Sequence, residues 1–405
     1  MLETHQLTAW RNAVFLIFAM PGIALATWVA RLPAIRDALD IRIDQVGLLV
    51  FGMAAGSIIG LLASSHVIAR FGTRRTIALL LPTTALGLAI VGLAVTLGPS
   101  FGLAFAGLVL FGAGSGATDV AMNVSGAANE RALKRSIMPI FHAFFSFGTM
   151  IGAGAGALAE AAQVPIAVHL GVVAAIIVIC TFIALPRLQS EHVIEEGAPA
   201  QSASEAGGSW RSRLSIWADP RTLLIGVLVL GAAFAEGSAN DWLALAMVDG
   251  QGVSNTVGAL VFGLFVTAMT AGRLGGVFLL DKFGRVPVLR GSFLLAAVGL
   301  LLLIMVPNPW VAAFGAVLWG LGAALGFPIG MSAAADDPQT AAARVSAVAT
   351  IGYFAFLVGP PVIGFLGEQV GLLSALLVVL VLCAIGALVS GAAREPEKRH
   401  AESNV

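Results

Sequence analysis

The chain has 405 residues, of which 58% are hydrophobic and only 11% are charged, and its formal net charge at pH 7 is zero. Soluble domains carry about 25% charged residues, so this composition and a mean hydropathy of +0.95 exclude an ordinary soluble protein and indicate a polytopic membrane protein. The balanced charge also argues against a nucleic-acid partner, because it provides no bulk attraction to phosphates.

Twelve apolar runs are long enough to cross a bilayer, which takes roughly 20 residues. The N-terminal segment has no basic region and no small-residue cleavage site, so we expect the first run to be a retained span rather than a signal peptide. The sequence therefore predicts an all-α fold of twelve transmembrane helices. The runs lie at approximately 12–32, 45–69, 76–98, 101–125, 137–161, 165–186, 221–246, 256–280, 288–307, 310–334, 345–367 and 371–392.

Glycine, proline and cysteine add local expectations. The 48 glycines are nearly twice the usual rough 7%, which favours helices packed closely through small residues. The motifs "FAMPG", "GFPIG" and "VGPPVIG" predict breaks in spans one, ten and eleven that allow bending and close helix approach. Cys180 and Cys383 lie in separate apolar runs without CxxC spacing, so we expect no disulfide framework, no metal site and no cofactor.

The basic residues predict the orientation in the membrane, because Lys and Arg collect in cytoplasmic loops. With the N-terminus inside, Arg31, Arg36 and Arg42 fall outside, and Arg273 falls within a span. The remaining 18 of the 22 basic residues then fall inside. We therefore expect a multi-pass inner-membrane protein with both termini in the cytoplasm.

Arg31 and His142 are two polar residues in or beside spans that invite a functional interpretation. Arg31, in "WVARLP", is expected to cap the outer end of span one by reaching toward water, with solute contact as the alternative. His142 lies early in span five, near the cytoplasmic end. Histidine titrates near neutrality, so it is a candidate for proton coupling through an Asp119 network, or it is a helix-end residue bonded to a backbone carbonyl.

Asp119 and Asn123 stand four residues apart inside the fourth apolar run, in "GATDVAMN". They share one helix face, and Ser115 extends that face by one turn. An ionised carboxylate at a span centre costs roughly 2.5–3.5 kcal/mol on insertion scales, so this face should meet a partner or an aqueous cavity. Our hypothesis is that Asp119 carries a proton, that Asn123 binds the solute or fixes the Asp119 rotamer, and that Ser115 contacts the solute. The alternative is a fixed pair that only orients helices.

The longest hydrophilic stretch separates six spans from six. Its segment "QSEHVIEEGAPAQSASEAGGS" is typical of a flexible linker. Trp210, Leu214 and Trp217 then share a helical face, which suits a short helix on the inner leaflet or an anchor for span seven. The predicted parts are an N-terminal half at 1–186, a cytoplasmic linker at 187–220, and a C-terminal half with a cytoplasmic tail at 221–405.

Span seven holds a second polar group in "AFAEGSANDW". Glu236 and Asn240 share a face, and Gly237 and Ser238 should weaken the helix locally, as in the discontinuous helices of transporters. We expect Glu236 to assist proton coupling and Asn240 and Trp242 to contact the solute. Asp241 is expected at the solvated outer end of the span, where Trp242 would meet the interface.

The two halves echo each other at a nearly constant offset. "RFGTR" at 70–74 resembles "KFGRV" at 282–286, "LFGAG" at 110–114 resembles "LWGLG" at 318–322, and Glu160 and Glu368 are 208 residues apart. Trp28 and Trp242 are 214 apart. Such matches indicate a duplicated six-span unit. Parallel repeats of this kind place a binding site near the midplane, in a central cavity between the halves.

These features together resemble the major facilitator superfamily over essentially the whole chain. Its loop signature is degenerate in "SHVIARFGTRR" and better kept in "GGVFLLDKFGRVP". "DVAMN", "FHAFFSFGTMIG" and "FAEGSANDW" are similar to the sugar–proton symporter branch that includes fucose permeases, in which the acid matching Asp119 serves proton coupling. The resemblance also implies a cytoplasmic gate of salt bridges between the halves, with plain positive-inside anchoring as the alternative. The gate candidates are Arg70, Arg74, Asp281, Arg285 and Arg344, with Glu130, Arg131, Asp336 and Asp337 on the same side.

The sequence thus predicts a secondary transporter and not an enzyme, since no HExxH or G-x-S-x-G motif is present. We expect alternating access and proton-coupled symport of a small polar, sugar-like solute. The alternative is proton-coupled efflux of a small organic compound, which the missing proline in "GTMIGAGAG" of span five disfavours. A membrane receptor without transport is a further alternative. The expected partners are the solute, protons and membrane lipid, with a monomer as the functional unit.

Overall fold

The computed structural model describes residues 4–133, 137–189, 216–337 and 340–395. All of its regular elements in these ranges are helices. The first six are α1 (Thr4–Ala30), α2 (Leu32–Leu39), α3 (Ile43–Thr96), α4 (Phe101–Leu133), α5 (Met138–Ala161) and α6 (Ile166–Ala184). The others are α8 (Pro220–Gln251), α9 (Asn255–Phe283), α10 (Arg285–Met305), α11 (Pro309–Ala323), α12 (Gly326–Ala334), α13 (Ala341–Val370), α14 (Leu372–Ala375) and α15 (Leu377–Val389), with short 3-10 turns at Leu185–Arg187, Ile216–Ala218 and Ser390–Ala393.

The predicted all-α fold with twelve transmembrane spans is confirmed. Eleven helical segments in the described ranges are long and apolar enough to cross a membrane, and one of them, α3, contains two spans. Gly72 divides α3 with a φ of 76° and a ψ of 159°, a conformation that favours glycine. The short helix α2, which begins with Pro33 in its first turn, was not predicted.

The proline motifs behave differently from one another. Span ten is interrupted between α11 and α12, as the "GFPIG" motif predicts. The breaks predicted in spans one and eleven are wrong, because α1 continues through Pro21 and α13 continues through Pro360 and Pro361. Both motifs instead permit close contacts, since Gly22 lies against the α5 backbone and Gly47 of α3 lies against Pro360. Most of the predicted interfacial helix lies outside the described residues.

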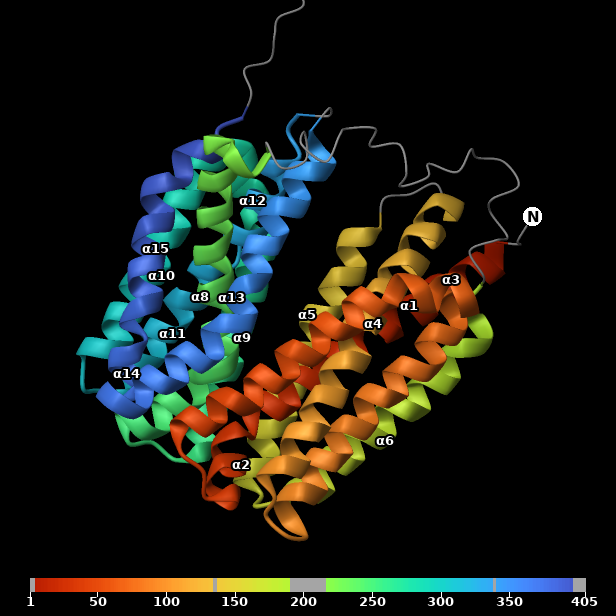
Figure 1. Ribbon diagram of the computed structural model, residues 1–405, viewed down its shortest axis with the longest axis horizontal. Coiled ribbons are helices and arrows are strands. Elements are labelled where there is room, and N and C mark those ends of the chain that lie inside the picture. The colour runs from red at the N-terminus through yellow and green to blue at the C-terminus, as the bar shows by residue number, and fades with distance from the viewer. Residues whose placement is uncertain (1–3, 134–136, 190–215, 338–339, 396–405) are drawn as a thin grey trace, which may run out of the picture.

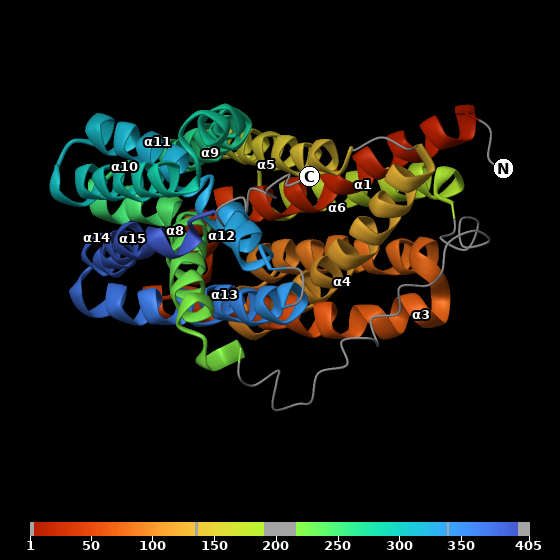
Figure 2. The same cartoon turned by 90° about the horizontal axis from the view of Figure 1, so that it is seen from above.

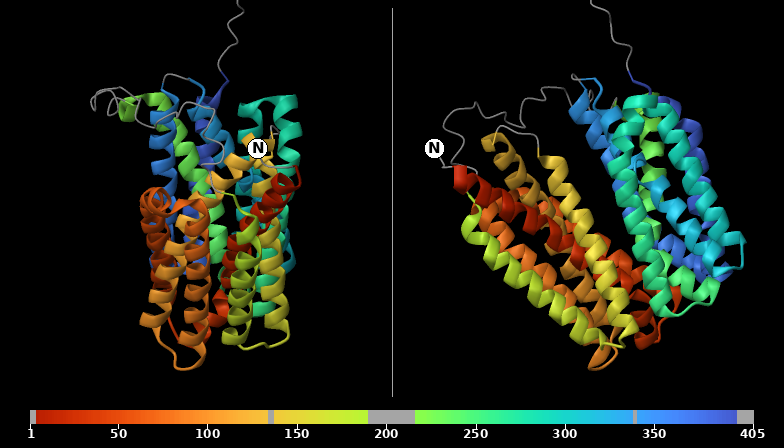
Figure 3. Two further views of the ribbon diagram at one scale, coloured as in Figure 1. Left: turned by 90° about the vertical axis from the view of Figure 1, so that its right-hand side faces the viewer. Right: turned by 180° about the vertical axis from the view of Figure 1, so that it is seen from behind.

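The helices form two bundles, α1–α6 and α8–α15, that meet at one end and diverge toward the other (Figures 1 and 3). We call the end that carries α2 the closed end, and the end that carries Thr4 and Glu395 the open end. Both described termini lie at the open end (Figure 1). Viewed from above, the two bundles lie side by side, with α1 and α5 running alongside α9 (Figure 2). The arrangement therefore exposes facing helix surfaces toward the open end.

Glycines hold α3 and α4 in close contact within the N-terminal bundle. A Cβ atom on Gly56 or Gly60 would collide with backbone oxygens of α4, and one on Gly112 or Gly116 would collide with backbone oxygens of α3. The two pairs have the same four-residue spacing, so the contact is reciprocal. Small residues at this spacing let transmembrane helices approach until their backbones touch. The glycine excess in the sequence thus has a direct structural use.

We expect Gly112→Ala to destabilise the protein, because its methyl group would meet the backbone oxygen of Met53. Overpacking of this kind costs typically about 1–3 kcal/mol. Gly171→Ala is the matched control, since Gly171 has open space around its Cβ position and alanine favours a helix. Thermal unfolding of the purified variants should give a lower midpoint for Gly112→Ala only. Equal midpoints for the two variants would contradict the close contact.

Candidate functional site

Asp119 lies in the middle of α4, where the sequence predicts it, and its side chain is exposed. The Asn123 side-chain amide donates to the Asp119 backbone oxygen at 2.8 Å and lies 3.5 Å from the Asp119 Oδ1 atom. Ser115, one turn earlier, is half-buried. Within the described residues Asp119 has no ion-pair partner. The expected polar stripe is therefore present, but no basic group neutralises its carboxylate.

The exposed Asp119 faces the other bundle. Its carboxylate interacts electrostatically with Tyr353, which belongs to α13 of the C-terminal half. An α4 side chain that acts on α13 cannot point outward into lipid. Asp119 therefore lies on the surface where the two halves face each other, which is where a polar stripe in a membrane span is least costly.

Glu236 and Arg273 form an ion pair inside the C-terminal half. The Arg273 Nη2 atom lies 2.8 Å from the Glu236 Oε1 atom, and both side chains are partly exposed. Glu236 occupies the middle of α8, and Arg273 lies on the facing part of α9. The sequence analysis placed Arg273 within a span without assigning it a partner. A cation isolated in an apolar run was the signal that could have identified this pair.

His142 lies within electrostatic range of this pair, across the boundary between the halves. It is an exposed residue of α5, and its ring meets the edge of Phe18 at a centroid distance of 5.3 Å. It interacts electrostatically with Arg273 of the C-terminal half. The three groups His142, Arg273 and Glu236 thus form a row that crosses from one half to the other. A link between His142 and Asp119 stays a prediction.

The remaining residues of the predicted α8 group have unequal surroundings. Asn240 is half-buried one turn beyond Glu236. Trp242 is fully buried, with its ring close to Gly364 of α13, so in this conformation it packs within the protein. The expectation of a solvated Asp241 is wrong, since Asp241 is only 9% exposed. The expected weakening of the helix at Gly237 is also absent, because α8 is continuous and the Phe356 ring supports that position.

The predicted gate residues lie at the open end, where the halves are apart. Arg285 pairs with Asp336 at 2.7 Å, and Arg344 pairs with Asp219 at 3.3 Å, and both pairs lie within the C-terminal half. Hydrogen bonds from Thr222 lower the pKa of Asp219, so this carboxylate is ionised at neutral pH. The described ion pairs at this end therefore brace one half. They do not join the two halves in this conformation.

The N-terminal gate candidates are differently placed. Arg70 lies over the Phe71 ring at 5.6 Å, and Arg74 is exposed. Asp281, which carries the acidic position of the loop signature in the other half, is also exposed. Glu130 accepts hydrogen bonds from the Ile137 and Met138 backbone amides and so supports the start of α5. A salt-bridge lock among these residues stays a prediction for another conformation.

Polar contacts between the halves occur at the closed end. Arg36 binds Asp249, and the Asn255 amide donates to Asp37 at 3.2 Å. Glu368 accepts from the Ile43 backbone amide at 3.2 Å. Arg36 and Asp249 are 213 residues apart, which is nearly the repeat offset, so the duplicated halves meet here through equivalent positions. The sequence analysis noticed the offset but did not predict this contact.

Breaking this contact should open the closed end. We expect the double variant Asp249→Asn, Glu368→Gln to widen the spin-label distance between Leu97→Cys and Pro307→Cys in a larger fraction of molecules. A loss of about 1 kcal/mol changes the ratio of the two states about fivefold. Asp40→Asn is the control, because Asp40 is exposed at the same end and has no ion pair within the described residues. Pulsed EPR gives the distances. An unchanged distance distribution in the double variant would show that these contacts do not hold the closed end together.

The sequence and fold identify the family. A model of the Major Facilitator Superfamily matches residues 12–277 and 238–404. The chain belongs to the Major Facilitator Superfamily. It is 30% identical to an uncharacterized transporter, y4wD, of Sinorhizobium fredii, over 92% of this chain and 97% of the relative. The protein is therefore a multi-pass membrane transporter, as the twelve-span pattern predicts.

Solved structures share the whole fold at low identity. A mutant of the nucleoside transporter NupG has a TM-score of 0.75 at 14% identity, covering 96% of this chain and 99% of that one. A mutant of the E. coli Fucose:proton symporter FucP has a TM-score of 0.63 at 17% identity, covering 95% and 98%. At these identities the likeness shows the fold alone. The predicted membership of the superfamily is confirmed, and the sugar–proton branch stays a prediction.

Proposed function

We propose that the protein is a proton-coupled symporter of a small polar, sugar-like solute, and that Asp119 carries the proton. The observation that carries this proposal is a carboxylate in the middle of a span that faces the other half without a basic partner. Such a group can be neutralised by a proton at modest cost, whereas a carboxylate held in an ion pair resists protonation. The unpaired acid and its amide neighbour Asn123 can therefore respond to both proton and solute.

The C-terminal half supplies the complementary groups. Glu236, Arg273 and Asn240 offer acceptors and donors that can bind hydroxyl groups, and His142 reaches the same row from the N-terminal half. Ionised Asp119, Glu236 and Arg273 together carry one net negative charge, so protonation of Asp119 would leave them neutral overall, which favours a solute without net charge. FucP and NupG share the fold, and their names describe carriers of a sugar and of nucleosides. Sugars and nucleosides are both polar molecules rich in hydroxyl groups.

We further propose that the open end faces the cytoplasm, so that the conformation is inward-facing. The distribution of basic residues supports this orientation, because 18 of 22 are predicted to fall on the side of the termini. Transport then requires the open end to close while the contacts between Arg36 and Asp249 and between Ile43 and Glu368 separate. The inner membrane is the location that this orientation implies.

Asp119→Asn should uncouple solute from protons while solute recognition persists. Asparagine keeps the size of the side chain and a carbonyl acceptor but cannot ionise. The solute is first identified by thermal shift among sugars, nucleosides and drugs, since a ligand of the folded state raises its stability. A one-unit pH difference is worth about 1.4 kcal/mol per proton, enough for about tenfold accumulation. We expect this accumulation in proteoliposomes to vanish in Asp119→Asn, with counterflow exchange retained.

Asp40→Asn is the matched control for this test, because it removes an exposed carboxylate at the end of α2 rather than one within α4. It should accumulate solute like the unmodified protein. Proton-driven accumulation by a well-folded Asp119→Asn variant would refute the role of Asp119. Loss of folding would instead indicate that the carboxylate only orients helices. Accumulation driven outward by the same gradient would favour the efflux alternative.

A further inference from the structure

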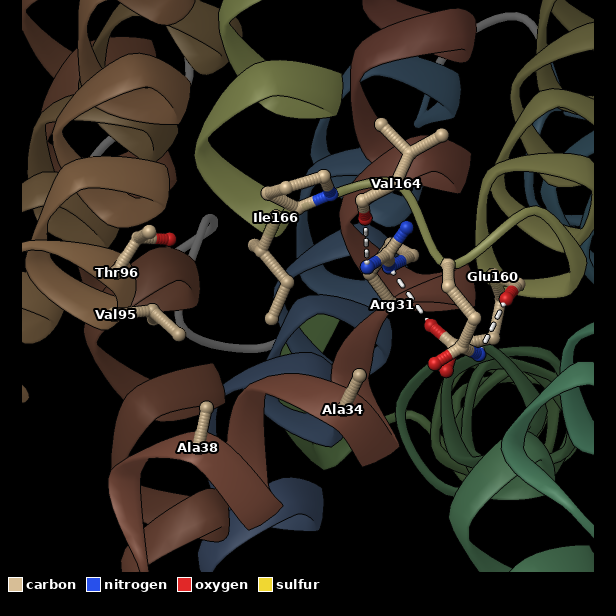
Figure 4. Close-up of a pocket in the computed structure, with 10 residues that line it drawn as sticks. Arg31, Ala34, Ala38, Val95, Thr96, Glu160, Val164 and Ile166 are labelled. Atoms are coloured by element: carbon tan, nitrogen blue, oxygen red, sulfur yellow. Dashed lines mark hydrogen bonds and ion pairs between the residues drawn. The ribbon is translucent and has the colours of Figure 1, made fainter.

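A cavity of about 350 Å³ lies at the closed end of the N-terminal half (Figure 4). Helix α2, the last turn of α3 and the loop between α5 and α6 form its walls. Ala34, Val95 and Ile166 are among its apolar lining residues, and Thr96 and Gln163 are polar ones. Its volume is within the range of small-molecule sites, which start near roughly 300 Å³.

Arg31 lines this cavity, and its charged side chain is unusually buried, with only 4% of it exposed. The Nε atom lies 3.0 Å from the Glu160 Oε2 atom, and the Nη2 atom donates to the Val164 backbone oxygen at 2.9 Å (Figure 4). The Nη1 atom is buried and has no hydrogen-bond partner among the described residues. Buried polar groups are nearly always satisfied, so Nη1 calls for an acceptor that the protein does not supply.

The site is balanced in charge. Arg31 and Glu160 neutralise each other at 3.0 Å, so a separate anion would meet the Glu160 carboxylate and a separate cation would meet the Arg31 guanidinium. His169 lies near Arg31 and is 8% exposed, with both ring nitrogens lacking a hydrogen bond within the described residues. An uncharged hydroxyl group suits this pair best, because it can accept from Arg31 and donate to Glu160 at once.

The second half lacks this arrangement. Trp28 and Trp242 occupy equivalent positions in the two halves, 214 residues apart, and the same offset places Leu245 opposite Arg31. Leu245 is fully buried in the apolar core. The second half therefore has no buried arginine at the position that matches Arg31. Arg31 is an addition to one half, at the wall of the cavity.

We propose that this cavity binds a small, uncharged polyhydroxyl molecule, of the sugar or polyol class. Arg31 Nη1 and Glu160 bind its hydroxyl groups, and Thr96 and Gln163 offer further polar contacts. The apolar walls pack against the C–H groups of the bound molecule. The site is separate from Asp119 and Glu236, and the inference does not rest on the proposed proton coupling.

The test uses thiol protection at the cavity. Ala38 lines the cavity and is exposed, so Ala38→Cys in a variant lacking Cys180 and Cys383 reports on local occupancy. The probe is D-glucose, with acetate and choline as charged comparisons. At ten times its dissociation constant glucose should leave about a tenth of the sites free and slow maleimide alkylation about tenfold. Pro307→Cys, at the closed end of the other half, is the control and should react at an unchanged rate.

Two second-site changes make the test specific. Ala34→Leu fills the cavity, and Arg31→Lys keeps the charge beside Glu160 but removes the free Nη1 donor. Each should abolish protection of Ala38→Cys while the thermal midpoint stays near that of the parent. If Arg31→Lys unfolds, Ala34→Leu alone decides. No protection by glucose, protection that survives Ala34→Leu, or equal protection by acetate or choline would overturn the proposal, and a rate change at Pro307→Cys would trace the effect to movement of the halves.

Discussion

The cost of an ionised side chain within the bilayer is the constraint on which this structure depends. A charge at the centre of a span costs roughly 2.5–3.5 kcal/mol on insertion scales unless it finds protein or water. Glu236 and Arg273 meet this constraint by pairing at 2.8 Å. Asp119 and His142 are exposed on helix sides that face the other half, so they need not meet lipid. These four groups therefore lie on the surface between the halves, where a solute can reach them.

Packing within each half and contact between the halves use different physics. Within the N-terminal half, Gly56 of α3 and Gly112 of α4 bring backbones into direct contact, and such an interface cannot slide without a collision. Between the halves, the closed end is held by polar pairs such as Arg36 and Asp249. Water can replace the partners of such pairs when they separate, so their net contribution is small. This contrast suits two rigid bodies that move against each other.

Sequence patterns predicted the features that depend on composition and period, and missed those that depend on which helices become neighbours. Apolar length identified the twelve spans, and the spacing of Asp119 and Asn123 identified a shared polar face. No local pattern could pair Arg273 with Glu236, because their contact joins two helices whose facing sides are set by packing. Arg31 was expected to reach water, yet the α5–α6 loop covers it and Glu160 binds it. The buried Asp241 was missed for the same reason, since its burial comes from neighbouring helices.

Proton movement during solute uptake tests the central claim most directly, because the proposed role of the unpaired acid between the halves requires it to exchange protons. Proteoliposomes with a pH-sensitive dye inside and no initial pH difference report this movement when an identified solute is added outside. The account predicts that the interior becomes acidic in fixed proportion to the solute that enters. Solute entry without a change in internal pH, or an interior that becomes alkaline, would contradict it.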